Sequence, residues 1–262
     1  TENKKKRVRE PSHKHREDHD EGHKTEHGHE HKKIPEIDIN KVLPLIAGLR
    51  LYHRHEVVGM DSIPKEGPAI IVVNHSLATY DITLLMAAIY VDMQRQPRPL
   101  IDRLFFKFPF LGELMVQLGA VQGSQETATN LIKEGHIITV APGGMREALR
   151  PSEERYQIRW DRRLGFVHLA MRTGAPIILA ACPKADDLYD VYPSRITSWA
   201  YKNLKIPLFL ARGLGPTPLP RPIKLVHFLS ERFDPPAWID DEEQREKVAK
   251  QFHQKLVKRM HS

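Results

Sequence analysis

The sequence predicts an α/β protein with a mixed, mostly buried central sheet flanked by helices. Three short apolar runs rich in β-branched residues are typical of strands covered on both faces; they are residues 69–73, 137–140 and 176–181. Segments with helical patterns separate these runs, so strands and helices alternate along the chain. In such sheets ligands bind at the carboxyl ends of the strands, which is where a site is expected.

The elements before residue 124 begin with an amphipathic helix over residues 39–53, which Pro44 should interrupt. A polar loop leads to the strand at residues 69–73, and a helical pattern follows over residues 80–90. The next apolar stretch, residues 100–118, is dense in phenylalanine at positions 105, 106, 108 and 110.

Start and stop signals mark the later helices. Ser124 opens a helix that Gly135 ends, and a helix over residues 163–173 closes at Gly174. The remaining elements are a stretch rich in Pro, Tyr and basic residues, a strand and a charged terminal helix, over residues 182–222, 223–229 and 240–260.

Residues 1–35 form a charged, His-rich tail that we expect to be disordered. They contain almost no apolar side chains, although seven of the chain's fifteen histidines lie there. Such a segment cannot bury enough surface to order itself. The histidines lack Cys partners and a fixed ligand frame, so no structural metal site is expected. One folded domain remains, residues 36–262.

The charge and the cysteine content of the chain restrict its binding partners and its cellular compartment. The net charge is +7, and the tail holds ten Lys/Arg against eight Asp/Glu, so the domain is mildly basic and suits anionic partners such as phospholipid headgroups. Acidic residues soon follow the basic run 4–9, so no nucleic-acid partner is expected. The single Cys182 excludes an intrachain disulfide and fits a reducing compartment. No apolar run is long enough to span a membrane, and the polar N-terminus is no secretory signal, so we expect a soluble or peripheral protein.

The strand at residues 69–73 leads directly into Asn74 and His75, and Asp81 follows. A neutral imidazole at a strand end can take a proton from a substrate hydroxyl, and a carboxylate can hold its tautomer. On an ideal helix the two side chains would lie about 120° apart, so contact requires His75 in the turn before the helix. A structural interpretation is equally open, with His75 as a loop residue and Asp81 as a charge that stabilises the helix N-terminus.

A second polar segment, residues 142–148 (Pro-Gly-Gly-Met-Arg-Glu-Ala), follows the strand at residues 137–140. Its glycines let the backbone approach a ligand closely, and their N–H groups can face an anion or a developing oxyanion. Arg146 offers a bidentate fork for phosphate or carboxylate. An ordinary turn in which Arg146 pairs with Glu147 or an aspartate also fits this segment alone.

Together the two segments resemble the glycerolipid acyltransferase superfamily, the lysophospholipid acyltransferase fold. Its first block is Asn-His with a following Asp, and its third is a Pro-Glu-Gly-Thr-Arg type of loop. Residues 119–124 are similar to the connection before the third block, and residues 174–178 (Gly-Ala-Pro-Ile-Ile) are similar to the fourth. The resemblance covers residues 57–235 and implies a glycerol-3-phosphate acyltransferase-like fold.

Departures from that pattern resemble one branch of the superfamily. Five residues separate His75 from Asp81 where four are common, Gly143 replaces the usual Glu, and Met145 replaces Thr. The two loop changes resemble the neutral-lipid branch, the diacylglycerol and phytyl-ester acyltransferase-like proteins, in which a Pro-Gly-Gly-x-Arg-Glu-Ala loop is typical. Residues 162–166 (Arg-Arg-Leu-Gly-Phe) are also similar to this branch.

The resemblance implies a role for each site residue. His75 would be the general base that deprotonates an acceptor hydroxyl, with Asp81 orienting it, and no acyl-enzyme is required. Arg146 and the backbone of Gly143 and Gly144 would bind the acceptor or the carrier's phosphates and help to stabilise the oxyanion. Three residues are weaker candidates. Asn74 would support the turn, and Glu147 would orient Arg146. Arg103 would contact a substrate phosphate.

The implied activity is O-acyl transfer from acyl-CoA or acyl carrier protein to a lipid hydroxyl, without a cofactor, by a protein peripheral on the cytoplasmic face of a membrane. The Pro-Gly-Gly loop favours a neutral acceptor, whereas superfamily frequency and the basic surplus favour a lysophosphatidate type. The phenylalanines would line an acyl channel, rest in the bilayer interface or pack in the core. A noncatalytic lipid-binding protein of the same fold is the alternative. A metal-dependent hydrolase is disfavoured because no His-Glu-x-x-His occurs.

Overall fold

The computed structural model describes residues 42–77, 80–103, 105–107, 109–192 and 210–262. The tail expected to be disordered, residues 1–35, lies outside these ranges, as does Phe108. All described residues fall within the expected domain of residues 36–262.

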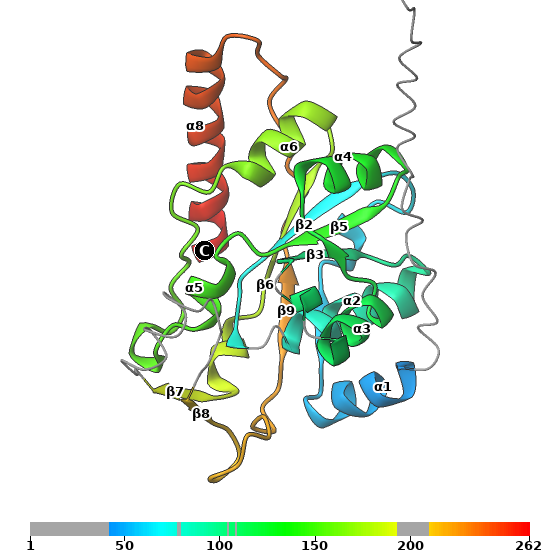
Figure 1. Cartoon of the computed structure of the whole chain (residues 1–262), viewed down its shortest axis with the longest axis vertical. Coiled ribbons are helices and arrows are strands. Elements are labelled where there is room, and N and C mark those ends of the chain that lie inside the picture. The colour runs from blue at the N-terminus through cyan, green and yellow to red at the C-terminus, as the bar shows by residue number, and fades with distance from the viewer. Residues whose placement is uncertain (1–41, 78–79, 104, 108, 193–209) are drawn as a thin grey trace, which may run out of the picture. The chain divides into compact units, whose positions relative to one another are not determined.

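A mixed sheet of seven strands confirms the predicted fold class (Figure 1). The strand order is β1-β9-β6-β2-β5-β3-β4, in which β9 runs antiparallel to β6 and every other neighbouring pair is parallel. Its strands are β1 (Glu56–Val58), β2 (Ala69–Val73), β3 (Arg98–Ile101), β4 (Val121–Gln122), β5 (Ile137–Val140), β6 (Ile177–Ala181) and β9 (Val226–Leu229). A separate antiparallel pair consists of β7 (Asp190–Tyr192) and β8 (Leu210–Arg212).

The helices follow the predicted signals closely. They are α1 (Leu43–Tyr52), α2 (Tyr80–Met93), α3 (Pro109–Gln117), α4 (Gln125–Lys133), α5 (Gly144–Ala148), α6 (Gly165–Thr173) and α8 (Glu242–His261). Short 3-10 turns cover Met60–Ser62, Phe105–Lys107, Ser152–Glu154 and Pro183–Asp187. Ser124 caps α4 by accepting the N–H of Thr127 at 2.9 Å, and Gly174 ends α6 in a left-handed conformation with φ 71°. Pro44 was wrongly expected to interrupt the first helix; it lies in the first turn, where proline needs no N–H partner.

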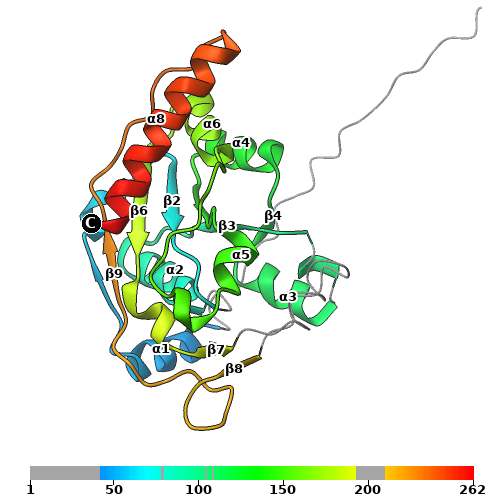
Figure 2. The ribbon, with the colours of Figure 1, turned by 90° about the vertical axis from the view of Figure 1, so that its left-hand side faces the viewer.

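Helices cover both faces of the sheet (Figures 1 and 2). On β2, Ile70 and Val72 pack into the cluster beneath α4, α6 and α8, whereas Ile71 and Val73 pack beneath α2. All five residues of β2 are buried, as a strand between two helical layers requires. The turn after β2 therefore begins from the centre of the core.

Three strands of the sheet were not predicted, namely β1, β3 and β4. They span two to four residues each and carry Glu56, Arg98 or Gln122, so they show neither an apolar run nor a clear alternation. Neighbouring strands recruit such segments, and a sequence pattern does not reveal that. Among the described helices, none has the length and apolar character to cross a membrane.

Candidate functional site

The turn between β2 and α2 holds the first group of candidate residues. Asn74 and His75 follow Val73 directly, and α2 starts only at Tyr80, so His75 lies outside the helix as expected. The Asn74 Oδ1 accepts the N–H of Cys182 at 3.0 Å and thereby joins the ends of β2 and β6. Through this bond Asn74 supports the turn.

The His75 side chain is 9% exposed, and its Nδ1 lies 2.9 Å from the carbonyl oxygen of Ser76. A carbonyl only accepts, so Nδ1 carries the proton and Nε2 keeps its lone pair. Burial lowers the pKa of His75 below its ordinary value, which keeps the imidazole neutral near pH 7. The geometry therefore provides a nitrogen that can accept a proton.

Asp81 does not reach His75 in the way we expected. This carboxylate, 1% exposed, accepts a hydrogen bond from the Ser76 hydroxyl at Oδ1, and its Oδ2 lies 3.6 Å from Nε2 of His227. The Ser76 carbonyl occupies the Nδ1 position of His75 that the carboxylate would have taken. Burial opposes ionisation of Asp81, but the contacts with His227 and Ser76 lower its pKa. Asp81 still acts on His75 through its charge, which raises the pKa of His75 against the effect of burial.

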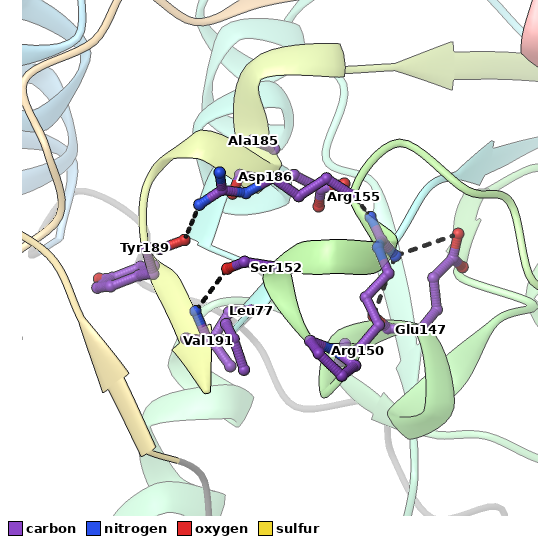
Figure 3. Close-up of a pocket in the computed structure, with 11 residues that line it drawn as sticks. Leu77, Glu147, Arg150, Ser152, Arg155, Ala185, Asp186, Tyr189 and Val191 are labelled. Atoms are coloured by element: carbon purple, nitrogen blue, oxygen red, sulfur yellow. Dashed lines mark hydrogen bonds and ion pairs between the residues drawn. The ribbon is translucent and has the colours of Figure 1, made fainter. Parts of the chain in front are cut away.

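The turn after β5 buries a glutamate and an arginine. Glu147 is fully buried, and its Oε1 lies 3.7 Å from Nη1 of Arg150 (Figure 3). Arg150 also donates to the carbonyl oxygens of His75 and Glu147, each at 3.0 Å, and pairs with Asp186. Arg150 therefore joins the turn after β2 to the turn after β5.

Neither oxygen of the Glu147 carboxylate makes a hydrogen bond of full geometry among the described residues, although the backbone N–H groups of Arg159 and His75 lie near enough to lower its pKa. Burial raises the pKa of Glu147 to about 7, against the opposing charge of Arg150. The expectation that Glu147 orients Arg146 was wrong. Glu147 is fully buried beside Arg150, whereas Arg146, one residue and about 100° earlier on α5, is exposed and pairs with Asp161.

Glycine is required at positions 143 and 144 of this turn for two different physical reasons. A Cβ on Gly143 would lie 1.6 Å from Oε2 of Glu147, so the buried carboxylate needs this glycine for space. Gly144 adopts a left-handed φ of +52°, and its N–H donates to the carbonyl of Ala141 at 3.0 Å. That N–H is already used within the turn, which differs from the anion-binding role expected for it.

Three arginines lie at different places around these turns. Arg146 is exposed and its Nη1 lies 3.7 Å from Oδ2 of Asp161, while Arg103 is exposed after β3, two strands from β2. Arg163, by contrast, donates to the carbonyl of Pro142 at 2.6 Å, and its charge lowers the pKa of His75 after the larger effect of burial. The charge of Arg150 lowers the pKa of His75 more than the charge of Arg163 does.

Arg163 is one of the residues that line a groove of about 320 Å³. Its walls come from the ends of β3 and β5 and from the first turns of α4 and α6. Leu100, Val140 and Phe166 give it an apolar lining. The second cavity, beside Arg150 and Tyr189, has only about 10 Å³, roughly the room for one water.

Sequence reasoning missed four residues of this region, namely Ser76, Arg150, Asp186 and His227. Only Ser76 had a signal, because it adjoins His75. The others come from distant segments, and three-dimensional packing brings them to the site. His227 also belongs to a cluster with Asp81 and Cys182 in which the potential ligand atoms lie within 4.8 Å of one another, although we expected no metal site.

Comparisons with known proteins identify the family. Residues 54–182 match the model of the acyltransferase family. The "DGAT1/2-independent enzyme synthesizing storage lipids" of Bos taurus and that of Homo sapiens are each 32% identical to the chain over 170 residues, which is 64% of the chain. These matches cover 51% and 52% of the two enzymes, so the chain spans about half the length of these relatives.

The fold also has a counterpart among solved structures. The 1-acyl-sn-glycerophosphate (LPA) acyltransferase PlsC from Thermotoga maritima matches with a TM-score of 0.51 over 85% of this chain and 79% of that one, at 16% identity. That identity supports the fold alone. The family match and the fold agree with the two sequence blocks at the ends of β2 and β5, and the chain belongs to the glycerolipid acyltransferase superfamily.

Proposed function

We propose that this acyltransferase moves a fatty acyl group from an acyl thioester, either acyl-CoA or acyl carrier protein, to a lipid hydroxyl. His75 acts as the general base, and the hydroxyl oxygen attacks the thioester carbonyl as its proton passes to Nε2. The thiolate then leaves and the ester is formed without an acyl-enzyme. The observation that carries this proposal is the bond from His75 Nδ1 to the Ser76 carbonyl, which leaves Nε2 unprotonated.

A neutral-lipid acceptor is favoured over a lysophosphatidate. The bovine and human relatives carry a name that refers to storage lipids, and the Pro-Gly-Gly loop fits the neutral-lipid branch. The exposed Arg146 pairs with Asp161, so its charge is partly neutralised already. That pairing reduces the case for a dedicated site for an acceptor phosphate at this residue.

The groove at Arg163 is the proposed position of the acyl chain of one substrate. Its apolar lining suits a hydrocarbon chain, and Arg163 can face the polar end of the ligand. Arg163 donates to the carbonyl of Pro142, which places this end of the groove beside the turn after β5.

Attachment to a membrane surface is part of the proposal. Leu45 and Leu51 of α1 are 67% and 79% exposed, and Leu219 is 58% exposed in the loop that contacts α1 through the bond from Tyr52 to the Pro220 carbonyl. Such side chains suit the bilayer interface, and the basic surplus suits anionic headgroups. Sedimentation of the protein with anionic liposomes at low salt tests this point. Protein that stays in the supernatant would contradict it.

The deciding experiment measures thiol release from long-chain acyl-CoA or acyl carrier protein by the purified protein and by His75→Ala. Monoacylglycerol, diacylglycerol, long-chain alcohol and lysophosphatidate serve as acceptors. We expect release that depends on a neutral acceptor and disappears in His75→Ala. Equal release by His75→Ala would remove His75 as the base, and no release from either donor with any acceptor would favour a noncatalytic lipid-binding protein.

A further inference from the structure

A row of polar side chains runs from the end of α1 to Asp81. Arg50 Nε donates to His55 Nδ1 at 3.3 Å, and His55 Nε2 lies 2.9 Å from His227 Nδ1. His227 Nε2 lies 3.6 Å from Asp81 Oδ2. His55, His227 and Asp81 are 8%, 1% and 1% exposed. Groups this deeply buried need partners, so the position of each proton matters.

Arg50 determines the direction of every hydrogen bond in this row. A guanidinium only donates, so His55 Nδ1 accepts and the proton of His55 is on Nε2. That proton is donated to His227 Nδ1, and the proton of His227 must therefore be on Nε2, on the side of Asp81. Neither ring can hold a second proton while the Arg50 bond persists. Both histidines are neutral, and Asp81 is the anion at the end of the row.

This direction also decides between two interpretations of the cluster of Asp81, Cys182 and His227. A bound cation would need the lone pair of His227 Nε2 and the thiolate of Cys182. The row of hydrogen bonds places a proton on that nitrogen, and burial raises the pKa of the Cys182 thiol. The cluster is therefore arranged for hydrogen bonding to Asp81 and not for a metal.

We propose that His227 is a positioning residue for acyl transfer and that His55 anchors it. His227 Nε2–H faces one oxygen of Asp81, and the other oxygen accepts a hydrogen bond from the Ser76 hydroxyl. The carbonyl of Ser76 in turn fixes the Nδ1 proton of His75. The 3.6 Å separation exceeds a formed hydrogen bond, and contacts of this kind commonly tighten when substrate binds. The inference rests on the proposed function only in assigning His75 as the base.

The first test measures imidazole ¹⁵N chemical shifts in the full-length protein labelled at histidine. Single His→Gln variants assign the signals. We expect a proton on Nε2 of His55 and of His227, and on Nδ1 of His75. A proton on Nδ1 of His227 would overturn the proposal, as would a shift of the His227 signal to that of a metal-bound ring on addition of Zn²⁺. This readout needs no activity, so it remains decisive even if the proposed reaction is wrong.

The second test compares His227→Gln with His227→Phe by steady-state acyl transfer. Glutamine can accept from His55 and donate to Asp81, so it should keep most of the wild-type kcat, whereas phenylalanine should lower kcat about tenfold to a hundredfold with KM unchanged. His253→Phe is the matched control, because His253 is also buried but packs against Trp160 in another cluster. Equal kcat for the Gln and Phe variants would overturn the proposal. If His227→Phe does not fold, the ¹⁵N measurement on the wild type decides.

Discussion

The turns after the neighbouring strands β2 and β5 are held in different ways. The turn after β2 is fixed by several separate links, among them the bond of Asn74 with the Cys182 backbone at the end of β6 and the local bond of Ser76 with Asp81. The turn after β5 has its own backbone bond and a bond from Arg163, but one buried side chain beyond it, Arg150, reaches both turns and Asp186. The loss of one link in the first turn should therefore leave its other links in place, whereas the loss of Arg150 should affect both turns.

The largest effect is expected for Arg150→Met. It removes the charged partner of the buried Asp186 carboxylate, which keeps only the N–H of Tyr156 at 2.7 Å, and it removes the link to the His75 carbonyl. Together these losses should lower the free energy of unfolding by about 3–5 kcal/mol. Urea denaturation measures this change. A loss below about 1 kcal/mol, the size of a typical surface change, would show that Arg150 does not hold the two turns together.

Gly143→Ala tests the close approach of Glu147. The new Cβ must displace a carboxylate oxygen 1.6 Å away, at a cost of about 1–3 kcal/mol in stability. Gly144→Ala should lower stability by about 1–2 kcal/mol because of the left-handed backbone conformation at this position. The new Cβ itself meets only the flexible end of the Arg163 side chain, which can move away. Thermal unfolding of the double variant Gly143→Ala/Glu147→Ala tests whether the stability lost in Gly143→Ala comes from the contact with Glu147. If the double variant loses as much stability as the two single variants together, the contact between residues 143 and 147 does not cause the loss in Gly143→Ala.

Glu147→Gln should change how stability depends on pH. The unfolded glutamate ionises near 4.5 and the folded one near 7, so the native state binds more protons between these values and loses stability as pH rises through them. The Gln variant lacks this loss. Between pH 5 and pH 8 its free energy of unfolding should rise relative to that of the wild type by on the order of 2 kcal/mol, at about 1.4 kcal/mol per pKa unit. Denaturation curves at both pH values measure it. Parallel stability profiles would contradict the raised pKa of the buried Glu147.

The smallest effect is expected for Arg146→Met. Its side chain is 69% exposed and its ion pair with Asp161 is solvated, so stability should change by less than about 0.5 kcal/mol. The same urea experiment serves as the matched control for Arg150→Met. A change as large as that of Arg150→Met would remove the contrast between the two arginines.

The sequence predicted where the two turns lie but not which of their side chains point inward. The strands at residues 69–73, 137–140 and 177–181 were visible as apolar runs, and both candidate segments were correctly placed at strand ends. The direction of each side chain was not visible, because rotation along the short helix α5 turns Glu147 inward and Arg146 outward. His227 was also missed, because a histidine within a strand shows no signal for the distant carboxylate beside it.

The central claim is that His75 acts as a neutral base whose Nε2 is free. The most direct measurement is the pH dependence of kcat/KM for acyl transfer by the wild-type protein, with His75→Gln as the control. Burial lowers the pKa of His75 below 6.5, so the activity plateau should extend below pH 6.5 before it falls. A fall centred at or above pH 6.5, or the same profile and rate in His75→Gln, would contradict the account.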